Sequence, residues 1–342
     1  MELGITTFAD VMPDPHGGAT IGYAERLRQV VEEAERTEEV GLDVYGVGEH
    51  HRPDFASSAP AVVLAAIAGK TSRIQLTPAV SILSSDDPVR VFQQYASLDA
   101  VSNGRAELLV GRGSFIESFP LFGYDLADYD ALFDEKLELL LKIRDEERVT
   151  WTGRFRSPLD RAGIYPRPER PLPIWVGVGG TPASIVRAAS NGLPVALAII
   201  GGNPDRFAFF ANLHRQVLAE HGFDPAHVPL AVHAHGHVAD TAEQAAEEFY
   251  PSYAAAMTQL GRERGWGPMS RLQFDAMRAP AGSLVLGSPE EVAEKIVRWR
   301  EILGIERFML HISVGTMPHD QVMRSIELLG TKVAPLVKEA TG

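Results

Sequence analysis

Residues 43–55, DVYGVGEHHRPDF, contain a short apolar strand that runs straight into a cluster of polar side chains. The first six residues are rich in valine and tyrosine, which favour strands, and a proline soon afterwards ends any regular structure. Glu49, His50 and His51 follow the strand directly. In a parallel barrel the carboxyl ends of the strands form the face that carries the active site. We therefore expect this cluster at the mouth of such a barrel. Because side chains alternate along a strand, Glu49 is expected to point away from its neighbour His50 and to orient or pack.

The same alternation of a short apolar run with a longer amphipathic segment recurs along the chain, and it predicts eight strands separated by helices. The expected strands are Leu3–Phe8, Asp43–Gly48, Ile74–Leu83, Ala106–Val110, Pro173–Val178, Val195–Ile200, Leu230–Val238 and Arg307–Ile312. This order predicts an α/β fold with a parallel sheet, and eight strands close into a TIM (β/α)8 barrel. We expect one domain over residues 1–342, with excursions at 149–170 and 241–283. The second excursion is too long for an ordinary loop and is expected to cover the mouth.

The amino-acid composition indicates which class of molecule the protein binds. The 342 residues include 32 basic and 45 acidic side chains, and the net charge of -13 opposes binding to nucleic acid or to anionic membranes. The chain contains no cysteine, no run of 18 apolar residues and no basic leader before its first strand. We therefore expect a cytoplasmic protein that acts on small molecules.

Two glycine-rich loops follow the fifth and sixth predicted strands. Gly179, Gly180 and Thr181 precede a helix that contains Ser184, and Gly201-Gly202 ends the next strand. Glycines let an anion approach the backbone, and a helix N-terminus offers free N–H groups, so these loops predict a phosphate site. The first loop is not a dinucleotide fingerprint, because a proline occupies its third glycine position and no acidic residue follows at the required distance.

Three histidines alternate along the seventh predicted strand, at positions 233, 235 and 237, and period two places them on one face. Alternating histidines on a strand can bind a metal. The remaining candidate ligands at strand ends are few: Glu49, His50, His51 and His311. We therefore assign no metal ligand and expect this face to shape a pocket, while a metal-dependent hydrolase remains an alternative.

Six short motifs together resemble one family over nearly the whole chain. They are Glu49-His50-His51, Asp87-Pro88-Val89-Arg90, Ser102-Asn103-Gly104-Arg105, Gly111-Arg112-Gly113, Tyr165-Pro166-Arg167-Pro168 and Gly192-Leu193-Pro194. Their order and spacing resemble the bacterial luciferase-like flavin-dependent monooxygenases. The resemblance implies a TIM barrel, usually dimeric, that binds reduced FMN at its C-terminal face. It also implies that reduced FMN reacts with O2 to a C4a-hydroperoxyflavin, which oxidises a small organic substrate.

The same resemblance assigns roles to individual residues. His50 matches the catalytic histidine of the family, and its ordinary pKa near neutrality suits proton transfer. Asp130 stands where the family has a second phosphate-side arginine. The implied cofactor contacts are a non-prolyl cis peptide at Ala79 and Val80, an arginine at Arg112, and a phosphate loop of Gly180, Thr181 and Ser184.

Alternatives remain open at this stage. A flavin-binding barrel without catalytic activity and a metal-dependent hydrolase are different classes of protein, and a deazaflavin in place of FMN is a variant of the monooxygenase. The chain has no second glycine cluster for a nicotinamide cofactor, so we expect a separate flavin reductase. The organic substrate is not identified by any motif.

Overall fold

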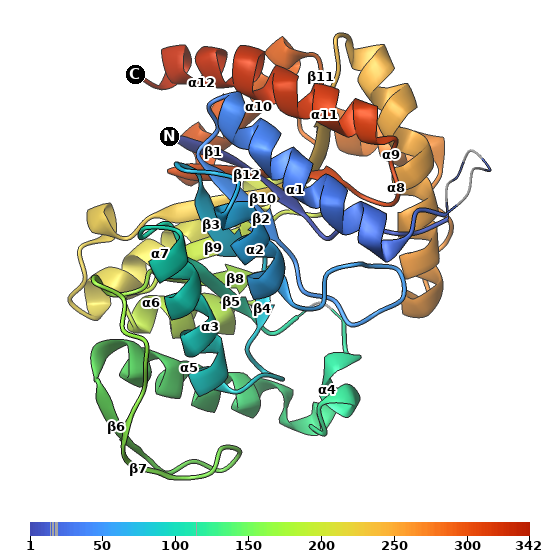
Figure 1. Cartoon of the computed structure of the whole chain (residues 1–342). Helices are drawn as coiled ribbons and strands as arrows, with labels where there is room; N and C mark the ends of the chain where they lie inside the picture. The colour runs from blue at the N-terminus through green and yellow to red at the C-terminus, as the bar shows by residue number, and fades with distance from the viewer. Residues whose placement is uncertain (14, 16, 18–19, 114) are drawn as a thin grey trace.

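The computed structural model describes residues 1–13, 15, 17, 20–113 and 115–342, and its centre is a nearly closed parallel barrel (Figure 1). The barrel strands follow the order β3-β2-β1-β12-β10-β9-β8-β5-β4. Their bounds are β1 Glu2–Thr7, β2 Val44–Val47, β3 Gln75–Pro78, β4 Ser81–Ile82, β5 Leu108–Gly111, β8 Ile174–Val178, β9 Val195–Ala198, β10 Leu230–Val238 and β12 Arg307–Ser313.

Closure of the barrel depends on one short pairing. A parallel bridge joins Leu76 of β3 to Ala106, which leads into β5. The third predicted strand is divided by a cis peptide bond between Ala79 and Val80, and its two halves are β3 and β4. Counted as one strand, these halves complete the eight that the sequence predicts. The TIM-barrel prediction is therefore confirmed.

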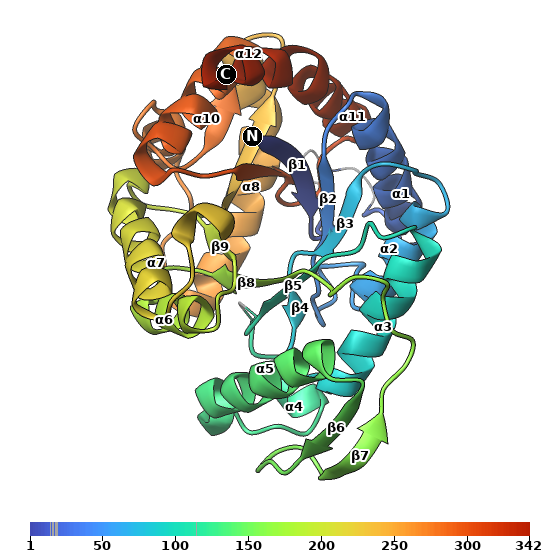
Figure 2. The same cartoon turned by 90° about the vertical axis from the view of Figure 1, so that its left-hand side faces the viewer.

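Helices form a ring outside the strands, which Figure 2 shows clearly. The larger helices are α1 Tyr23–Glu39, α2 Pro60–Ala68, α3 Pro88–Val101, α5 Tyr129–Asp145, α6 Pro182–Ser190, α7 Ala208–Glu220, α10 Pro289–Leu303, α11 His319–Leu328 and α12 Ala334–Thr341. A short helix, α4, spans Ser118–Leu121. Local signals fix several of their starts: Asp87 caps α3 and Ser288 forms a capping box with Glu291 at α10.

The two predicted excursions have their own secondary structure. Within the first, β6 (Arg148–Trp151) and β7 (Leu159–Gly163) form an antiparallel hairpin. The second contains α8 (Ala242–Arg264), which ends at a left-handed glycine, and α9 (Arg271–Arg278). In Figure 1 both chain termini lie on the side opposite α8 and α9. These two helices therefore pack at the carboxyl end of the barrel.

Three strands lie outside the eight that were predicted: β6 and β7 of the hairpin, and β11. β11, Val285–Gly287, pairs in parallel with the last three residues of β10. Three residues are too few to show strand periodicity. The pairing is very close, because a Cβ on Gly236 of β10 would lie 1.9 Å from the carbonyl oxygen of Val285. Glycine at this position is what lets β11 join β10.

A buried polar network fixes α1 against the barrel. Arg26 donates to Glu33 at 2.6 Å, and the hydroxyl of Tyr45 on β2 donates to the same carboxylate at 3.1 Å. Although burial opposes ionisation, the charge of Arg26 lowers the pKa of Glu33. Buried charges are tolerated when they are paired and hydrogen-bonded in this way.

Within the described ranges, no helix is both long and apolar enough to cross a membrane.

Candidate active site

A cavity of about 410 Å³ lies at the carboxyl end of the barrel, and we call it the mouth cavity. Its wall is mostly apolar, with a few polar side chains from the loop after β1 and from β10, β12 and α8. The aromatic and methionine residues of the wall are Phe8, Phe55, Phe115, Trp266, Met12, Met257, Met269 and Met277. The polar ones are Asp10, His235, His311 and Arg264. An apolar pocket with few convergent polar groups is typical of a small-molecule site.

His50 lies behind this aromatic wall. Its ring centroid is 4.4 Å from those of Phe8 and Phe55 and 5.1 Å from that of Phe115. Neither ring nitrogen has a hydrogen-bond partner among the described residues. Burial lowers the pKa of His50 to about 3. The expectation of a pKa near neutrality is therefore wrong, because the hydrocarbon rings disfavour the charged imidazolium and leave a neutral imidazole.

Glu49 does not face the mouth but joins the ends of two strands. One carboxylate oxygen lies 3.0 Å from Nε2 of His51, and the other accepts from the backbone N–H of Ile82 at 3.0 Å. Ile82 belongs to β4, directly after the cis peptide. Glu49 therefore positions the segment on which a flavin ring was expected to lie, in agreement with an orienting role.

The predicted cis peptide between Ala79 and Val80 is confirmed. Two glycines on neighbouring strands make room for the Val80 side chain. A Cβ would lie 2.7 Å from Val80 at Gly111 and 2.8 Å from it at Gly177. Gly177, on β8 just before the first glycine-rich loop, is therefore required for close packing.

Arg112 and Ser184 meet although they are 72 residues apart in the chain. The guanidinium of Arg112 donates to Oγ of Ser184 at 3.1 Å, lies 4.9 Å from the ring centroid of Tyr129, and forms an ion pair with Asp130. The predicted phosphate-side arginine and the predicted phosphate loop thus come together. The carboxylate of Asp130 neutralises part of the positive charge of Arg112 that would otherwise attract an anion.

The glycine loops have open backbone at this end of the barrel. Gly180 has a φ of 107°, and a Cβ on Gly179 would meet nothing within 4 Å. Thr181 precedes the nine-residue helix α6 without a side-chain capping bond. Gly201 and Gly202 line the mouth cavity itself. These features leave room and N–H groups for an anion next to Arg112.

The alternating histidines of β10 have three different environments. Oγ1 of Thr6 lies 2.6 Å from Nε2 of His233 and 3.1 Å from Nδ1 of His311. His235 lines the mouth cavity, and His237 pairs with Glu248 of α8 at 2.8 Å. In the described ranges, no group of three or more histidine, aspartate or glutamate side chains has the geometry of a metal site.

Burial keeps the inner imidazoles neutral. It lowers the pKa of His233 to about 4 and that of His235 to about 3, and it lowers the pKa of His311 well below its usual value. A neutral imidazole carries one donor and one acceptor nitrogen. Thr6 can donate to one ring and accept from the other, so the tautomers of His233 and His311 are linked.

Asp10 is the main polar residue that the sequence interpretation missed. It follows the first strand by only a few residues, so the strand-end rule that selected His50 also applies to it. Burial raises the pKa of Asp10 to about 7, although Oδ1 accepts a hydrogen bond from the N–H of Gly315 at 2.9 Å. Oδ2 has no partner in the described part of the chain.

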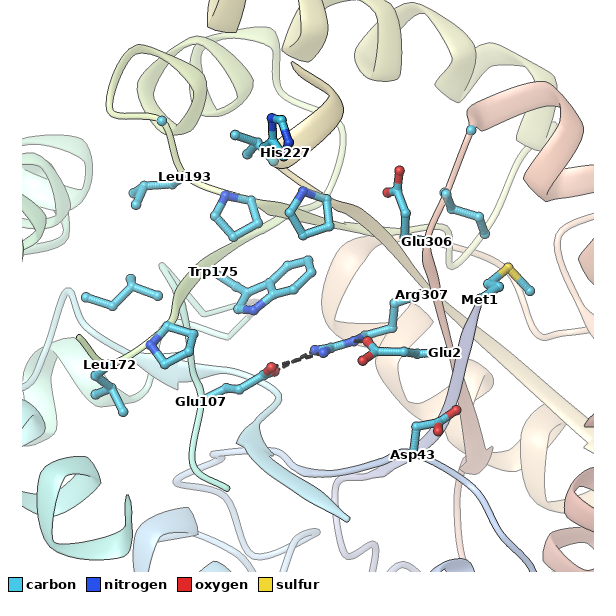
Figure 3. Close-up of a pocket in the computed structure, with 18 of the residues that line it drawn as sticks. Met1, Glu2, Asp43, Glu107, Leu172, Trp175, Leu193, His227, Glu306 and Arg307 are labelled. Carbon is cyan, nitrogen blue, oxygen red and sulfur yellow. Dashed lines mark hydrogen bonds and ion pairs between the residues drawn. The ribbon is translucent and has the colours of Figure 1, made fainter. Parts of the chain in front are cut away.

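A larger cavity, of about 1060 Å³, lies at the opposite end of the barrel, where the strands begin (Figure 3). Figure 3 shows Arg307 extended below Trp175 toward Glu107. Arg307 donates to Glu107 at 2.5 Å and to Glu2 at 2.7 Å, and it stacks 4.6 Å from the ring centroid of Trp175. These charges are satisfied by one another. In TIM barrels this face serves stability, and the active site lies at the other end.

The chain matches the family described as "Luciferase-like monooxygenase" over residues 1–306. The protein therefore belongs to the luciferase-like monooxygenase family, and it is an oxidoreductase. This finding removes the hydrolase alternative.

By their names, the relatives include both monooxygenases and F420-dependent dehydrogenases. The N-acetyl-S-alkylcysteine monooxygenase of Bacillus subtilis is 28% identical over 334 residues, which is 91% of this chain and 93% of that protein. An F420-dependent glucose-6-phosphate dehydrogenase of Amycolatopsis mediterranei is 31% identical over 173 residues, 47% of this chain and 52% of that protein. The oxygenating constituent of 3,6-diketocamphane monooxygenase from Pseudomonas putida, solved with FMN, has a TM-score of 0.78 at 20% identity, covering 98% of both chains. Its likeness establishes the fold.

The buried imidazoles predict a loss of stability in acid. Their folded-state pKa values lie below the unfolded value near 6.5, so the unfolded chain binds more protons as the pH falls from 6.5 toward 4. Each such group then costs about 1.4 kcal/mol of unfolding free energy per pH unit. We expect His235→Gln to shrink the difference in unfolding free energy between pH 7 and pH 5 by about 2 kcal/mol, measured by urea titration.

The matched control is His227→Gln, at a histidine whose side chain is 83% exposed. It should leave the difference between the two pH values unchanged. An equal effect of both substitutions would show that burial of His235 does not determine its protonation.

Proposed function

We propose that this protein is a monooxygenase that uses reduced FMN and O2 to oxidise a small, mainly apolar organic molecule. The observation that carries the proposal is the mouth cavity. It combines an apolar wall with buried neutral imidazoles, and glycines 201 and 202 border it. Membership of a family of flavin- and F420-using oxidoreductases supports the same conclusion.

The residues near the mouth suit a flavin phosphate. Arg112 offers a planar set of donors, Ser184 a hydroxyl, and the start of α6 open backbone beside Gly179. Guanidinium groups and helix N-termini are common partners of phosphate. The cis peptide between Ala79 and Val80 would support the ring system. When bound, reduced FMN supplies the electrons that activate O2.

The chain itself contributes orientation, dryness and proton transfer. The aromatic and methionine wall excludes water from the reacting atoms and suits an apolar substrate. His50, in its neutral form, has one nitrogen able to accept a proton and one able to donate a hydrogen bond. We propose that His50 exchanges a proton with the reacting oxygen. The imidazole becomes accessible when the side chain of Phe8, Phe55 or Phe115 moves aside for the bound molecules.

Arg112→Met should weaken FMN binding by about 10- to 100-fold, because a charge-assisted hydrogen bond contributes about 1.5–3 kcal/mol. Riboflavin, which lacks the phosphate, should bind both proteins with the same affinity. Isothermal titration calorimetry with the two flavins isolates the contribution of the phosphate.

Asp130→Asn is the matched variant at the same ion pair. It leaves Arg112 in place and removes a competing anion, so FMN affinity should stay equal or rise. If the Arg112 variant lost FMN and riboflavin equally, the phosphate would lie elsewhere.

The function is tested by supplying chemically reduced FMN under ¹⁸O2 with a panel of apolar aldehydes, ketones and thioethers. We expect one ¹⁸O atom in a product by mass spectrometry. His50→Ala should lower its formation by roughly 10²-fold or more, the usual scale for a positioned acid or base, while FMN affinity is retained.

Two further experiments determine which cofactor the protein uses and whether the protein reduces that cofactor itself. A reduced product formed with reduced F420, or a dehydrogenated product formed with oxidised F420, in either case without ¹⁸O, would replace the proposed reaction by hydride transfer. NADH or NADPH with FMN and no reductase should leave the flavin absorbance unchanged without oxygen, since we propose that a separate reductase supplies reduced FMN. Bleaching at the rate of turnover would contradict this.

We also propose that the protein forms a homodimer through the outer face of α2. This helix packs beside α3, and it exposes Val62 by 70% next to the small side chains of Ala65 and Ala66. Val62→Glu should convert a dimer to a monomer in sedimentation velocity experiments. Leu272→Glu, at a leucine on α9 that is 81% exposed, should leave the dimer intact. A wild-type monomer would contradict the proposal.

A further inference from the structure

Asp10 lies between two cavities. It lines the mouth cavity, and it also lines a second cavity of about 350 Å³ between the barrel, α1 and α11, which we call the side cavity. The residue is 3% exposed, and Oδ1 of its side chain accepts a hydrogen bond from the N–H of Gly315. Oδ2 is therefore a buried polar atom that no group among the described residues satisfies.

An unsatisfied buried oxygen requires an explanation, because such atoms usually cost free energy. Asp10 and Phe55 form an isolated antiparallel bridge between the loops after β1 and β2, so the backbone fixes Asp10. Nothing in this bridge needs a carboxyl group at that position. A carboxylic acid that can give and regain a proton explains both the free oxygen and the contact with two cavities.

The side cavity leads toward solvent through polar groups. His319 lines it at the start of α11, and its side chain is 24% exposed. Its Nδ1 lies 3.5 Å from Oε1 of Glu33, and its Nε2 lies 3.1 Å from Oε2 of Glu32. These carboxylates, with the contact to Glu33 as the main cause, raise the pKa of His319. The outer end of the cavity thus holds a group that readily carries a proton.

Charged and titratable side chains approach Asp10 from every packed element. Arg26 of α1 is hydrogen-bonded to Glu33, and its positive charge disfavours protonation of Asp10. The negative charge of Asp54, in the loop after β2, favours protonation of Asp10. The groups that share a cavity with Asp10 are Glu25, Arg26, Glu33, His235, Arg264, His311 and His319. Burial outweighs these opposing charges and raises the pKa of Asp10.

We propose that Asp10 delivers protons to the molecule bound in the mouth cavity and is reloaded through the side cavity. The Asp10 O–H bond breaks, its proton forms an O–H bond on an oxygen of the reacting molecule, and the carboxylate keeps the electron pair. Solvent in the side cavity then gives one proton to the carboxylate and takes one from the imidazolium of His319. His319 is reprotonated from bulk water, so no net charge accumulates.

The role of Asp10 in turnover rests on the proposed function, but its titration does not. Asp10→Asn keeps the volume of the side chain and an oxygen for the Gly315 N–H, and it removes only the transferable proton. The matched control is Asp99→Asn, at another buried aspartate with an unpartnered oxygen, on α3 and outside both cavities.

The first measurement uses the protein without flavin. The ¹³C signal of the Asp10 carboxyl, assigned from the Asp10→Asn spectrum, should titrate near pH 7. Since a raised folded-state pKa favours folding only while the group is protonated, wild type should lose stability relative to Asp10→Asn between pH 5 and pH 8. A carboxyl that is already ionised at pH 5 would overturn the proposal, whatever the reaction of the enzyme.

The second measurement uses turnover with reduced FMN and O2. Asp10→Asn should lower it by roughly 10²-fold with FMN affinity unchanged, whereas Asp99→Asn should have wild-type activity. Wild-type turnover should fall above pH 7, and Asp10→Glu should restore part of the rate. If wild type turns over and Asp10→Asn matches it from pH 6 to 8, Asp10 has no such role. If wild type does not turn over, the proposed function fails, and the titration alone decides whether Asp10 exchanges protons.

Discussion

The backbone pairing of Leu76 on β3 with Ala106, which leads into β5, closes the barrel, and most features of the site depend on that closure. In a closed parallel barrel every strand must deliver its carboxyl end to the same face. Residues as distant in the chain as Asp10, His50 and His311 therefore become neighbours of one cavity or its wall. The buried carboxylate of Glu49 completes the arrangement by joining β2 to the segment after the cis peptide.

The two ends of the barrel differ in whether their buried polar groups have hydrogen-bond partners. At the end where strands begin, Arg307 is paired with Glu107 and Glu2. At the mouth, Oδ2 of Asp10 and both ring nitrogens of His50 lack partners among the described residues. Paired charges stabilise a fold, whereas unpaired polar atoms in a dry pocket are available to a ligand. This contrast, rather than cavity size, is the reason that we propose the mouth as the place of the reaction.

The sequence predicted the fold well because strand order and helix starts depend on local patterns. It also placed the Ala79–Val80 cis peptide correctly, through resemblance to a family. β11 was missed because three residues carry no periodicity, and its pairing needs only the absence of a side chain at Gly236. The pKa of His50 was misjudged for another reason. It depends on three phenyl rings that come from separate segments, and no local pattern reports such packing.

The inner imidazoles are linked rather than independent, and this limits what each can do. Thr6 has one hydroxyl proton, so it can donate to His233 only when it accepts from His311, or the reverse. A proton that leaves one ring toward the mouth is therefore replaced only if the other ring changes tautomer. Asp10 has no such constraint, because the residue also lines a second cavity. Of the polar groups around the mouth cavity described above, the carboxyl group is thus the one whose proton can be renewed without rearranging the barrel interior.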